Sequence, residues 1–361
     1  MAAPTSPARV LLLVALGCTL AAPLACGSSD GGVDPGAAAP DPDGGGSVLP
    51  DGAIGSRPDG ATTPDSATPT TGIKTVFLIL MENHSWATIK GAGASATYIN
   101  GTLLPMGAHA EAYATPPGNH PSEPNYVWLE AGDNLGIKDD KAPSVNHQST
   151  KDHLTAQLEA KNIAWRAYSE DAPAGACPLT ASGLYDPKHT PQLYFDDVTD
   201  TNQPTSAHCL EHVKPYADFA TDLTANKVGR YNFITPNLCN DMHGNGFGGA
   251  CSLIASDSGK IKLGDDWLAA QIPKILASAA YQDNGVIFVL WDEGDEAPLQ
   301  SAADGPIGMI AISPLAKKGF ASSTPFTHSS MLRTLEAIFG VPYLRGAKAA
   351  QPLSEMFTAF P

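Results

Sequence analysis

The sequence is short of positive charge. Its 361 residues include 21 Lys and Arg against 37 Asp and Glu, and the formal net charge is -16. Residues 73–361 keep a charge of about -11 once the seven Asp and one Arg of 27–72 and the single Arg9 are set aside. Nucleic-acid binding needs clustered Lys and Arg, so this acidic composition argues against nucleic acid as a partner.

The sequence also lacks an apolar run that we would interpret as a membrane-spanning helix of the mature chain. The run "VLLLVALGCTLAAPLA" (10–25) is short and rich in small residues at its end, which is typical of a secretory signal peptide over 1–25. "PLAC" followed by "GSSDGG" resembles the cleavage site of bacterial lipoproteins, in which Cys26 becomes the lipidated first residue. The expected location is therefore outside the cytoplasm, either on the cell envelope through a lipid anchor or secreted; plain secretion with cleavage nearby is the alternative.

Large apolar side chains are scarce in residues 26–72, which consist mainly of Gly, Pro, Ala, Ser, Thr and Asp. Such a segment cannot bury enough apolar surface to offset the entropy lost on ordering. We therefore predict a disordered tether over 26–72 and one folded domain over 73–361.

Cysteine is scarce too, with six in the chain. No CxxC spacing supports a zinc site. Setting Cys18 and Cys26 aside leaves an even number, which in an exported chain suggests two disulfides. Three pairings are possible, and the most local one is Cys177–Cys209 with Cys239–Cys251.

Four apolar runs rich in β-branched residues predict buried strands at 75–81, 231–235, 286–291 and 307–312. Helical patterns lie at 152–162, 265–281 and 328–340, and the last is bounded by Thr327 and Gly340. This alternation predicts an α/β fold with a mostly parallel sheet and helices on both faces. The stretches 87–120 and 163–230 are expected to be loop-rich cap segments.

Polar side chains follow the predicted strands. They are Glu82, Asn83 and His84 after the first, Asn237, Asp241 and His243 after the second, Asp292 and Glu293 after the third, and Ser313, Pro314 and then His328 after the fourth. Ligands of open α/β sheets bind beyond the carboxyl ends of the strands, so we expect a shared cleft there. Histidines outside these clusters are expected at the surface: His109, His147, His153, His208 and His212.

Ser122 follows Pro121 and precedes a short helical pattern, so we expect it to cap that helix. A helix N-terminus attracts phosphate, and a hydroxyl there can attack phosphorus if a base or metal helps to remove its proton. Carboxylates and an Asn nearby can hold a divalent cation through oxygen ligands. The alternative for Ser122 is an ordinary cap, and the alternative for Asp292 and Glu293 is a solvated turn.

Six blocks together resemble the secreted phosphoesterase family, which includes acid phosphatases and phosphatidylcholine-type phospholipases C and whose fold is related to alkaline phosphatase. The blocks are "FLILMENHSW", "HPSEPNYVWLEAG", "KHTPQLYFDDV", "YNFITPNLCNDMHG", "DDWLAAQIPKILASAAYQDNGVIFVLWDEGD" and "THSSMLRTLEAIFG". They run in order through nearly all of 74–345. The forms "HPSEPNY" and "NDMHG" favour the acid phosphatase branch.

The resemblance implies roles for individual residues. Ser122 would be the nucleophile that becomes phosphorylated, and Glu82 and Asn83 would lie at the metal and the phosphate. The remaining implied residues are Asp292, Glu293 and Asp241 at a metal, His243 and His328 at the phosphoryl group, and His120 and His189 at the substrate. The metal would be divalent, of unspecified identity.

The expected function is therefore that of an exported phosphomonoesterase that hydrolyses a small phosphate ester through a phosphoserine. A phospholipase C acting on phospholipid headgroups is the alternative enzyme. A non-catalytic cell-surface binding protein on the same fold is the alternative of another class. The sequence leaves the oligomeric state open.

Overall fold

The computed structural model describes residues 72–244, 251, 256–294 and 302–361. The signal peptide (1–25), Cys26 and all but the last residue of the tether (26–72) lie outside these residues, so they stay predictions. In the described part of the chain, no helix is both long enough and apolar enough to cross a membrane.

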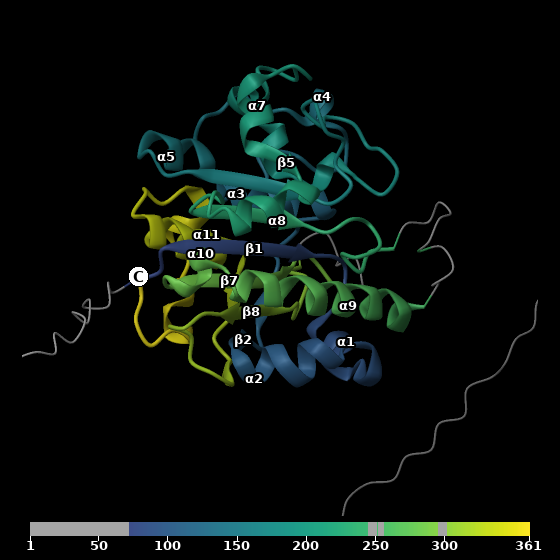
Figure 1. The fold of residues 1–361 in the computed structure, drawn as a ribbon, viewed down its shortest axis with the longest axis vertical. Coiled ribbons are helices and arrows are strands. Elements are labelled where there is room, and N and C mark those ends of the chain that lie inside the picture. Colours follow the sequence, from purple (N-terminus) through teal and green to yellow (C-terminus); the bar gives the residue numbers. More distant parts are fainter. Residues whose placement is uncertain (1–71, 245–250, 252–255, 295–301) are drawn as a thin grey trace, which may run out of the picture. The chain divides into compact units, whose positions relative to one another are not determined.

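The centre of the fold is an eight-stranded sheet with the strand order β5-β4-β6-β1-β7-β8-β2-β9 (Figure 1). All strands run parallel except β8, which is antiparallel to both neighbours. The mostly parallel sheet is thus confirmed. The strands are β1 (Thr75–Met81), β2 (Ala108–Ala110), β4 (Trp165–Ser169), β5 (Val213–Pro215), β6 (Tyr231–Thr235), β7 (Gly285–Trp291), β8 (Met309–Ile312) and β9 (Phe320–Ser322), and a separate pair is formed by β3 (Tyr113–Ala114) and β10 (Phe326–Thr327).

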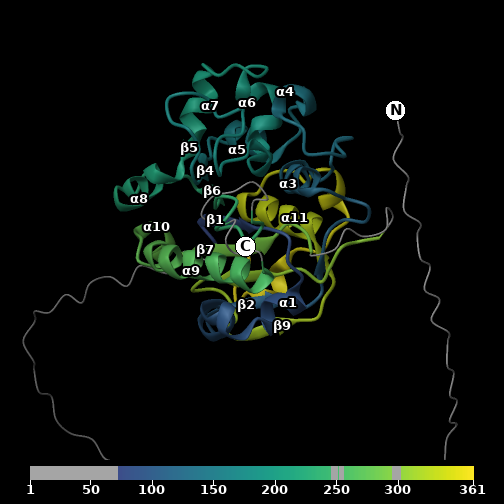
Figure 2. The same cartoon turned by 90° about the vertical axis from the view of Figure 1, so that its right-hand side faces the viewer.

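Helices cover both faces of the sheet. They are α1 (Trp86–Gly91), α2 (Leu104–Met106), α3 (Ser122–Ala131), α4 (Pro143–Asn146), α5 (Leu154–Ala160), α6 (Asp196–Thr199), α7 (Ala207–His212), α8 (Tyr216–Thr224), α9 (Asp257–Leu276), α10 (Ala279–Gln282) and α11 (His328–Phe339). Figure 2 shows α8, α9 and α10 on one face, and α3 and α11 on the other. Every residue of the central strands β1 and β7 is buried as a result, which explains their continuous apolar sequences.

The predicted helices are present, with shifted bounds. The pattern at 265–281 corresponds to the longer α9 and the separate α10, which begins after Ser278 because the Ser278 side chain accepts a hydrogen bond from the Tyr281 N–H. The third helix agrees closely with its prediction. Thr327 and Ser330 form a capping box at its start, and Gly340 ends it at φ 64°.

The segments expected to be loop-rich also contribute strands to the sheet. β2 lies in 87–120, and β4 and β5 lie in 163–230. They are short, and β4 interrupts its apolar pattern with Arg166, so no apolar run marks them in the sequence.

The direction of β8 corrects one expectation about the strand ends. Because β8 runs antiparallel to β7, its carboxyl end lies beside the start of β7. The Ser313 hydroxyl accordingly donates to the carbonyl of Gly285, the first residue of β7, at 2.8 Å. Ser313 therefore lies beside the amino-terminal end of β7, far from the carboxyl ends of β1 and β7. The expectation that it shares their cleft is wrong.

Two disulfides join Cys177 to Cys209 and Cys239 to Cys251, which is the most local of the three pairings. The first ties α7, which carries Cys209, to the segment before α6.

Three histidines expected at the surface are buried: His109, His153 and His212. The surface prediction is wrong for these three because each ring packs against an aromatic side chain of the fold. His153 also lies 3.2 Å from Glu130 and 3.0 Å from Asp197.

Candidate active site

The carboxyl ends of β1 and β7 bring together Glu82 and Asn83, which follow β1, with Asp292 and Glu293, which follow β7. The strands are parallel neighbours, with Met81 paired to Trp291. Asn83 adopts a left-handed conformation at φ 40°, which Asn tolerates better than most residues. Its N–H donates to Asp292 Oδ1 and its Nδ2 donates to Glu293 Oε1, each at 3.2 Å. These two hydrogen bonds connect the segment that follows β1 to the segment that follows β7.

Ser122 is the first residue of α3, and Pro121 occupies the N-cap position. The capping prediction is wrong, because the Ser122 hydroxyl makes no capping bond. It donates instead to Glu82 Oε2 at 3.0 Å, with both side chains buried. The helix start and the end of β1 therefore meet at this hydroxyl.

Glu293 is bound from a second side. His120 Nδ1 lies 2.8 Å from Glu293 Oε2, and His120 Nε2 lies 3.3 Å from Asp304 Oδ2. Burial lowers the pKa of His120, but the hydrogen bonds with Asp304 and Glu293 outweigh it and raise the pKa to about 10. His120 is therefore an imidazolium at neutral pH. Asn125 Nδ2 also donates to Glu293 Oε2, at 3.0 Å.

His189 connects the end of β1 to the segment after β6. Its Nε2 lies 3.2 Å from Glu82 Oε1 and its Nδ1 lies 3.6 Å from Asp241 Oδ2. The ring stacks on Tyr126 at 4.9 Å. Burial lowers the pKa of His189 well below its ordinary value, so the ring is neutral. The Asp241 carbonyl also accepts from the Glu82 N–H at 2.8 Å.

His243 lies at the margin of this group. Its N–H donates to Asp241 Oδ1 at 2.8 Å, and its ring centre is 6.5 Å from that of His189. The ring Nδ1 donates to the Gly244 carbonyl at 2.7 Å. Nε2 is thus the nitrogen left for other partners.

His328 lies behind Asp292. As the first residue of α11, it places Nε2 2.7 Å from the Asp292 carbonyl, and its Nδ1 is 3.2 Å from the Tyr113 hydroxyl. Burial lowers the pKa of His328 to about 4. The ring is neutral and uses both nitrogens in these bonds, so this geometry suits positioning of Asp292 better than direct proton donation to a substrate.

Four carboxyl groups share this buried space: Glu82, Asp241, Asp292 and Glu293. Burial, followed by repulsion from neighbouring carboxyls, raises the pKa of Asp292 well above its ordinary value. Burial raises the pKa of Glu82 and Asp241 in the same direction. A cluster of this kind needs either protons or a cation to balance its charge.

Several oxygen atoms of this cluster have no hydrogen-bond partner among the described residues. They are Asn83 Oδ1, Asp241 Oδ2 and Asp292 Oδ2, all buried. Hard divalent cations bind carboxylate and amide oxygens. The donor set therefore fits a divalent cation, with Glu82 and the three orphaned oxygens as its candidate ligands.

All ten sequence-predicted site residues make a direct contact with another member of the set: Glu82, Asn83, His120, Ser122, His189, Asp241, His243, Asp292, Glu293 and His328. The sequence reasoning missed Asn125 and Tyr126, although both lie in the block "HPSEPNY". Asn125 is three residues after Ser122, a spacing that puts both on one side of α3. Nothing in the sequence marks Asp304.

Known proteins resemble this chain in sequence and in fold. A sequence model described as the Phosphoesterase family matches residues 111–342. The phosphatidylinositol-3-phosphatase of Mycobacterium tuberculosis is 29% identical over 282 residues, which cover 78% of this chain and 82% of that protein. The phosphate-repressible acid phosphatase of Penicillium chrysogenum is 27% identical over 63% of this chain. That match spans only about half (51%) of the fungal protein.

The fold itself has a counterpart among solved structures. A protein in the alkaline phosphatase superfamily from Vibrio parahaemolyticus superposes with a TM-score of 0.51 at 11% sequence identity, over 80% of this chain and 73% of that one. At this identity the likeness concerns the fold alone. It confirms the expected alkaline-phosphatase-like architecture.

Proposed function

Because the chain belongs to the phosphoesterase family, we propose that this phosphoric ester hydrolase is an exported phosphomonoesterase of the acid phosphatase type with Ser122 as its nucleophile. One observation carries the assignment: the buried Ser122 hydroxyl, at the start of α3, donates to Glu82 Oε2 at 3.0 Å beside a cluster of carboxyl groups. The names of the fungal and mycobacterial relatives support phosphate esters as the substrate class.

The proposed reaction has two steps. Ser122 Oγ bonds to phosphorus while the bond between phosphorus and the alcohol oxygen breaks, and the hydroxyl proton passes to Glu82 Oε2. Glu82 has to be ionised for this role, and a divalent cation beside the carboxyl cluster would favour that form. Water then attacks the phosphoserine, phosphate leaves, and Ser122 Oγ regains a proton. The N-terminal end of α3 and the Asn83 amide orient the phosphoryl oxygens.

His243 is the residue that we assign to protonate the leaving alcohol. Its Nδ1 is bonded to the Gly244 carbonyl, which leaves Nε2 for this role. Burial lowers the pKa of His243. Its imidazolium form, which can donate the proton, is therefore populated only at more acid pH than that of an ordinary histidine, and this suits an acid phosphatase. His120, positively charged between Glu293 and Asp304, and His189, beside Glu82, are proposed to contact the substrate.

A divalent cation would be held by oxygen atoms of Glu82, Asn83, Asp241 and Asp292. Glu293 would flank it without being one of its ligands. When bound, such an ion neutralises charge on the phosphoryl group and on the surrounding carboxylates.

We also propose that residues 1–25 direct export, that Cys26 carries a lipid anchor, and that 26–72 form the tether of the phosphoesterase domain 73–361. The two disulfides support export, because such bonds persist in oxidising compartments.

The test is hydrolysis of p-nitrophenyl phosphate by the full chain and by three variants. Ser122→Ala is expected to lower kcat by at least about 10³-fold, and no phosphorylated peptide containing residue 122 should then form on rapid quenching. Asn83→Ala should lower kcat/KM. Ser313→Ala is the matched control, because Ser313 is also a buried serine but lies beside the amino-terminal end of β7, away from the candidate site. Full turnover by Ser122→Ala would refute the assignment of Ser122 as the nucleophile. No turnover by the parent itself would instead favour the non-catalytic binding protein.

A lipid phosphomonoester is a second candidate substrate, and the name of the mycobacterial relative favours it. Release of inorganic phosphate from vesicles with phosphatidylinositol 3-phosphate would support this substrate. Release of phosphocholine from phosphatidylcholine vesicles would instead support the phospholipase C alternative. Activity on p-nitrophenyl phosphate alone would point to small esters.

A further inference from the structure

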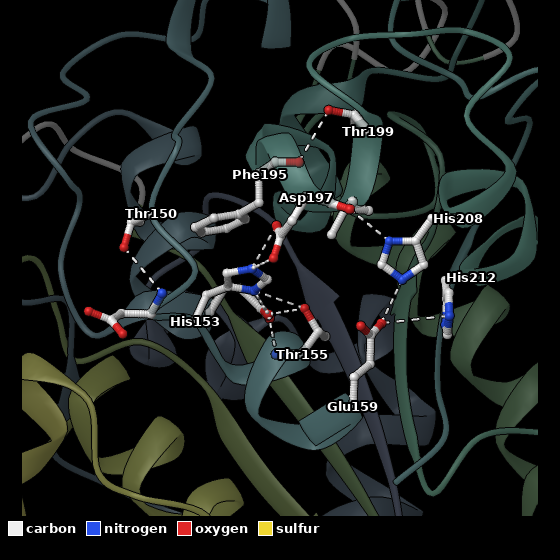
Figure 3. A network of polar contacts seen from close by, with 12 residues as sticks. Thr150, His153, Thr155, Glu159, Phe195, Asp197, Thr199, His208 and His212 are labelled. Carbon is white, nitrogen blue, oxygen red and sulfur yellow. Dashed lines mark hydrogen bonds and ion pairs between the residues drawn. The ribbon is translucent and has the colours of Figure 1, made fainter. Parts of the chain in front are cut away.

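A second group of ligand-type side chains lies apart from the carboxylate cluster, between α5 and α7. It comprises Glu159 of α5 and His208 and His212 of α7 (Figure 3). The two histidines are four residues apart, so their rings project from one side of the helix. His208 Nε2 is 2.7 Å and His212 Nε2 is 3.6 Å from Glu159 Oε1. The three ligand atoms all lie within 4.8 Å of one another.

Backbone carbonyls orient both imidazoles. His208 Nδ1 is 2.8 Å from the Asp197 carbonyl, and His212 Nδ1 is 3.0 Å from the Trp165 carbonyl. Arg166 Nη1 is 3.3 Å from His212 Nδ1 but donates to the same Trp165 carbonyl at 2.9 Å. With Nδ1 bonded to a carbonyl, Nε2 is the nitrogen that each ring turns toward Glu159. This is how metal-binding histidines are usually held. In the absence of a metal His208 Nε2–H donates to Glu159 Oε1 at 2.7 Å, so a metal ion would bind by displacing that proton.

The neighbours of the cluster hold it in place. Trp165 Nε1 donates to Glu159 Oε1 at 2.7 Å, and the Trp165 ring stacks on His212 at 4.3 Å. His153 is bonded to the Asp197 side chain at 3.0 Å (Figure 3), which fixes the residue whose carbonyl orients His208. The disulfide of Cys209 anchors α7 next to His208. The ligands are therefore largely preorganised, which lowers the cost of binding an ion.

The cluster is also open to solvent. The exposed fractions of the Glu159, His208 and His212 side chains are 35%, 28% and 11%. Ligands at about 2.1 Å in a tetrahedral site lie about 3.4 Å apart. The observed separations of 2.7 and 3.6 Å need only small side-chain shifts to reach that geometry. One coordination position would remain for water.

We propose that Glu159, His208 and His212 form a second metal site that binds Zn²⁺ or a chemically similar divalent transition-metal ion and joins α5 to α7. Two imidazole nitrogens with one carboxylate oxygen suit Zn²⁺, Cu²⁺ and Ni²⁺ better than Mg²⁺ or Ca²⁺. The site is independent of the proposed function, since none of its ligands belongs to the carboxylate cluster.

Zinc binding by the full chain tests the proposal. After chelator treatment and dialysis, calorimetric titration with Zn²⁺ should show an equivalent with a micromolar or tighter Kd that is lost in Glu159→Gln, separate from any ion that the carboxylate cluster binds. The Gln side chain keeps an oxygen acceptor for Trp165 Nε1, so this variant should fold. His208→Gln should lose the same equivalent. Two controls should keep it: His147→Gln, at an exposed histidine nearby, and Asp292→Asn, in the carboxylate cluster.

A second readout is independent of stoichiometry. Cu²⁺ bound to the parent should show nitrogen hyperfine splitting in its electron paramagnetic resonance spectrum, and this signal should weaken in His208→Gln. Equal zinc stoichiometry and Kd in the parent and in Glu159→Gln would overturn the proposal, and so would binding weaker than micromolar in the parent. Glu159→Gln should keep its phosphatase activity, so this test and the test of Ser122 fail separately.

Discussion

Ser122 and Glu82 are forty positions apart in the sequence, yet a buried hydrogen bond of 3.0 Å joins their side chains. Glu82 is held from the other side by His189, at 3.2 Å from Oε1. The carboxyl group thus has one oxygen directed at the proposed nucleophile and the other at a neutral imidazole. This arrangement suits a group that accepts the hydroxyl proton and returns it.

Glu82→Gln tests that role. The amide oxygen can still accept the hydrogen bond from Ser122, but it cannot take up its proton. We expect kcat to fall by about 10²-fold or more, in steady-state assays at saturating divalent metal.

Glu123→Gln is the matched control, because Glu123 is the next residue of α3 and is also buried. Burial raises the pKa of Glu123 to about 8, so at pH 6 its carboxyl group is mostly neutral and an amide resembles it closely. This variant should keep kcat within about threefold of the parent. Similar losses in both variants would indicate damage to α3 instead of a lost proton acceptor.

The sequence predicted much of the fold because the central strands are buried on both faces. β1 and β6 have their predicted bounds, and α11 has the predicted punctuation at Thr327 and Gly340. Short strands such as β2 depend on pairing with distant segments, and three residues carry no periodicity of their own. The antiparallel direction of β8 is likewise a property of the whole sheet.

The residues of the candidate site likewise divide into those that the sequence indicates and those that only the structure reveals. Glu82 and Asp292 follow buried strands, and that position makes them visible in the sequence. Asn125 and Asp304 enter through a helix side and a loop, where only the three-dimensional arrangement reveals them. His208 and His212 are expected at the surface because they follow no predicted strand. Their partners in the fold are residues of α5, β4 and α6.

The disulfide between Cys177 and Cys209 closes a loop with a sequence separation of 32. Replacing both cysteines with Ala should lower the free energy of unfolding by about 4 kcal/mol, mainly because the unfolded chain gains conformational freedom. The shorter loop of Cys239 and Cys251, with a separation of 12, should cost about 3 kcal/mol. Urea unfolding of the two double variants measures this. A larger loss for the shorter loop would contradict the prediction.

His153 should make stability depend on alkaline pH. Burial lowers its pKa, but hydrogen bonds with Asp197 and Glu130 outweigh that and raise it to about 9. The folded-state pKa lies above the ordinary value of about 6.5, so the stabilisation is complete below that pH and is lost as the pH rises through about 9. A shift of this size corresponds to about 3 kcal/mol at most.

The measurement is urea unfolding of the parent and of His153→Gln at pH 6 and pH 10, with chelator present. The difference in free energy of unfolding should shrink at pH 10. His208, whose pKa the hydrogen bond with Glu159 raises to about 9, titrates in both proteins and cancels in the difference. His147→Gln, at an exposed residue, should track the parent within about 0.5 kcal/mol at both pH values. A difference independent of pH would contradict the assignment.

The carboxylate cluster should make the metal-free protein less stable as the pH rises above about 4. Burial raises the pKa of Glu82, Asp241 and Asp292 in the folded state. The unfolded chain then releases protons that the folded chain keeps, so the free energy of unfolding falls with pH from the ordinary carboxyl pKa of about 4 up to the raised folded values.

A divalent cation that replaces those protons should remove this dependence of stability on pH. Thermal unfolding between pH 4.5 and pH 7 should therefore show a falling Tm with chelator and a nearly level Tm with excess divalent metal. Asp292→Asn removes one carboxyl group whose ionisation the fold opposes, so in chelator at pH 7 it should be more stable than the parent, although its activity should be lost. A parent whose Tm is the same with chelator and with metal at every pH would show that no cation balances this cluster.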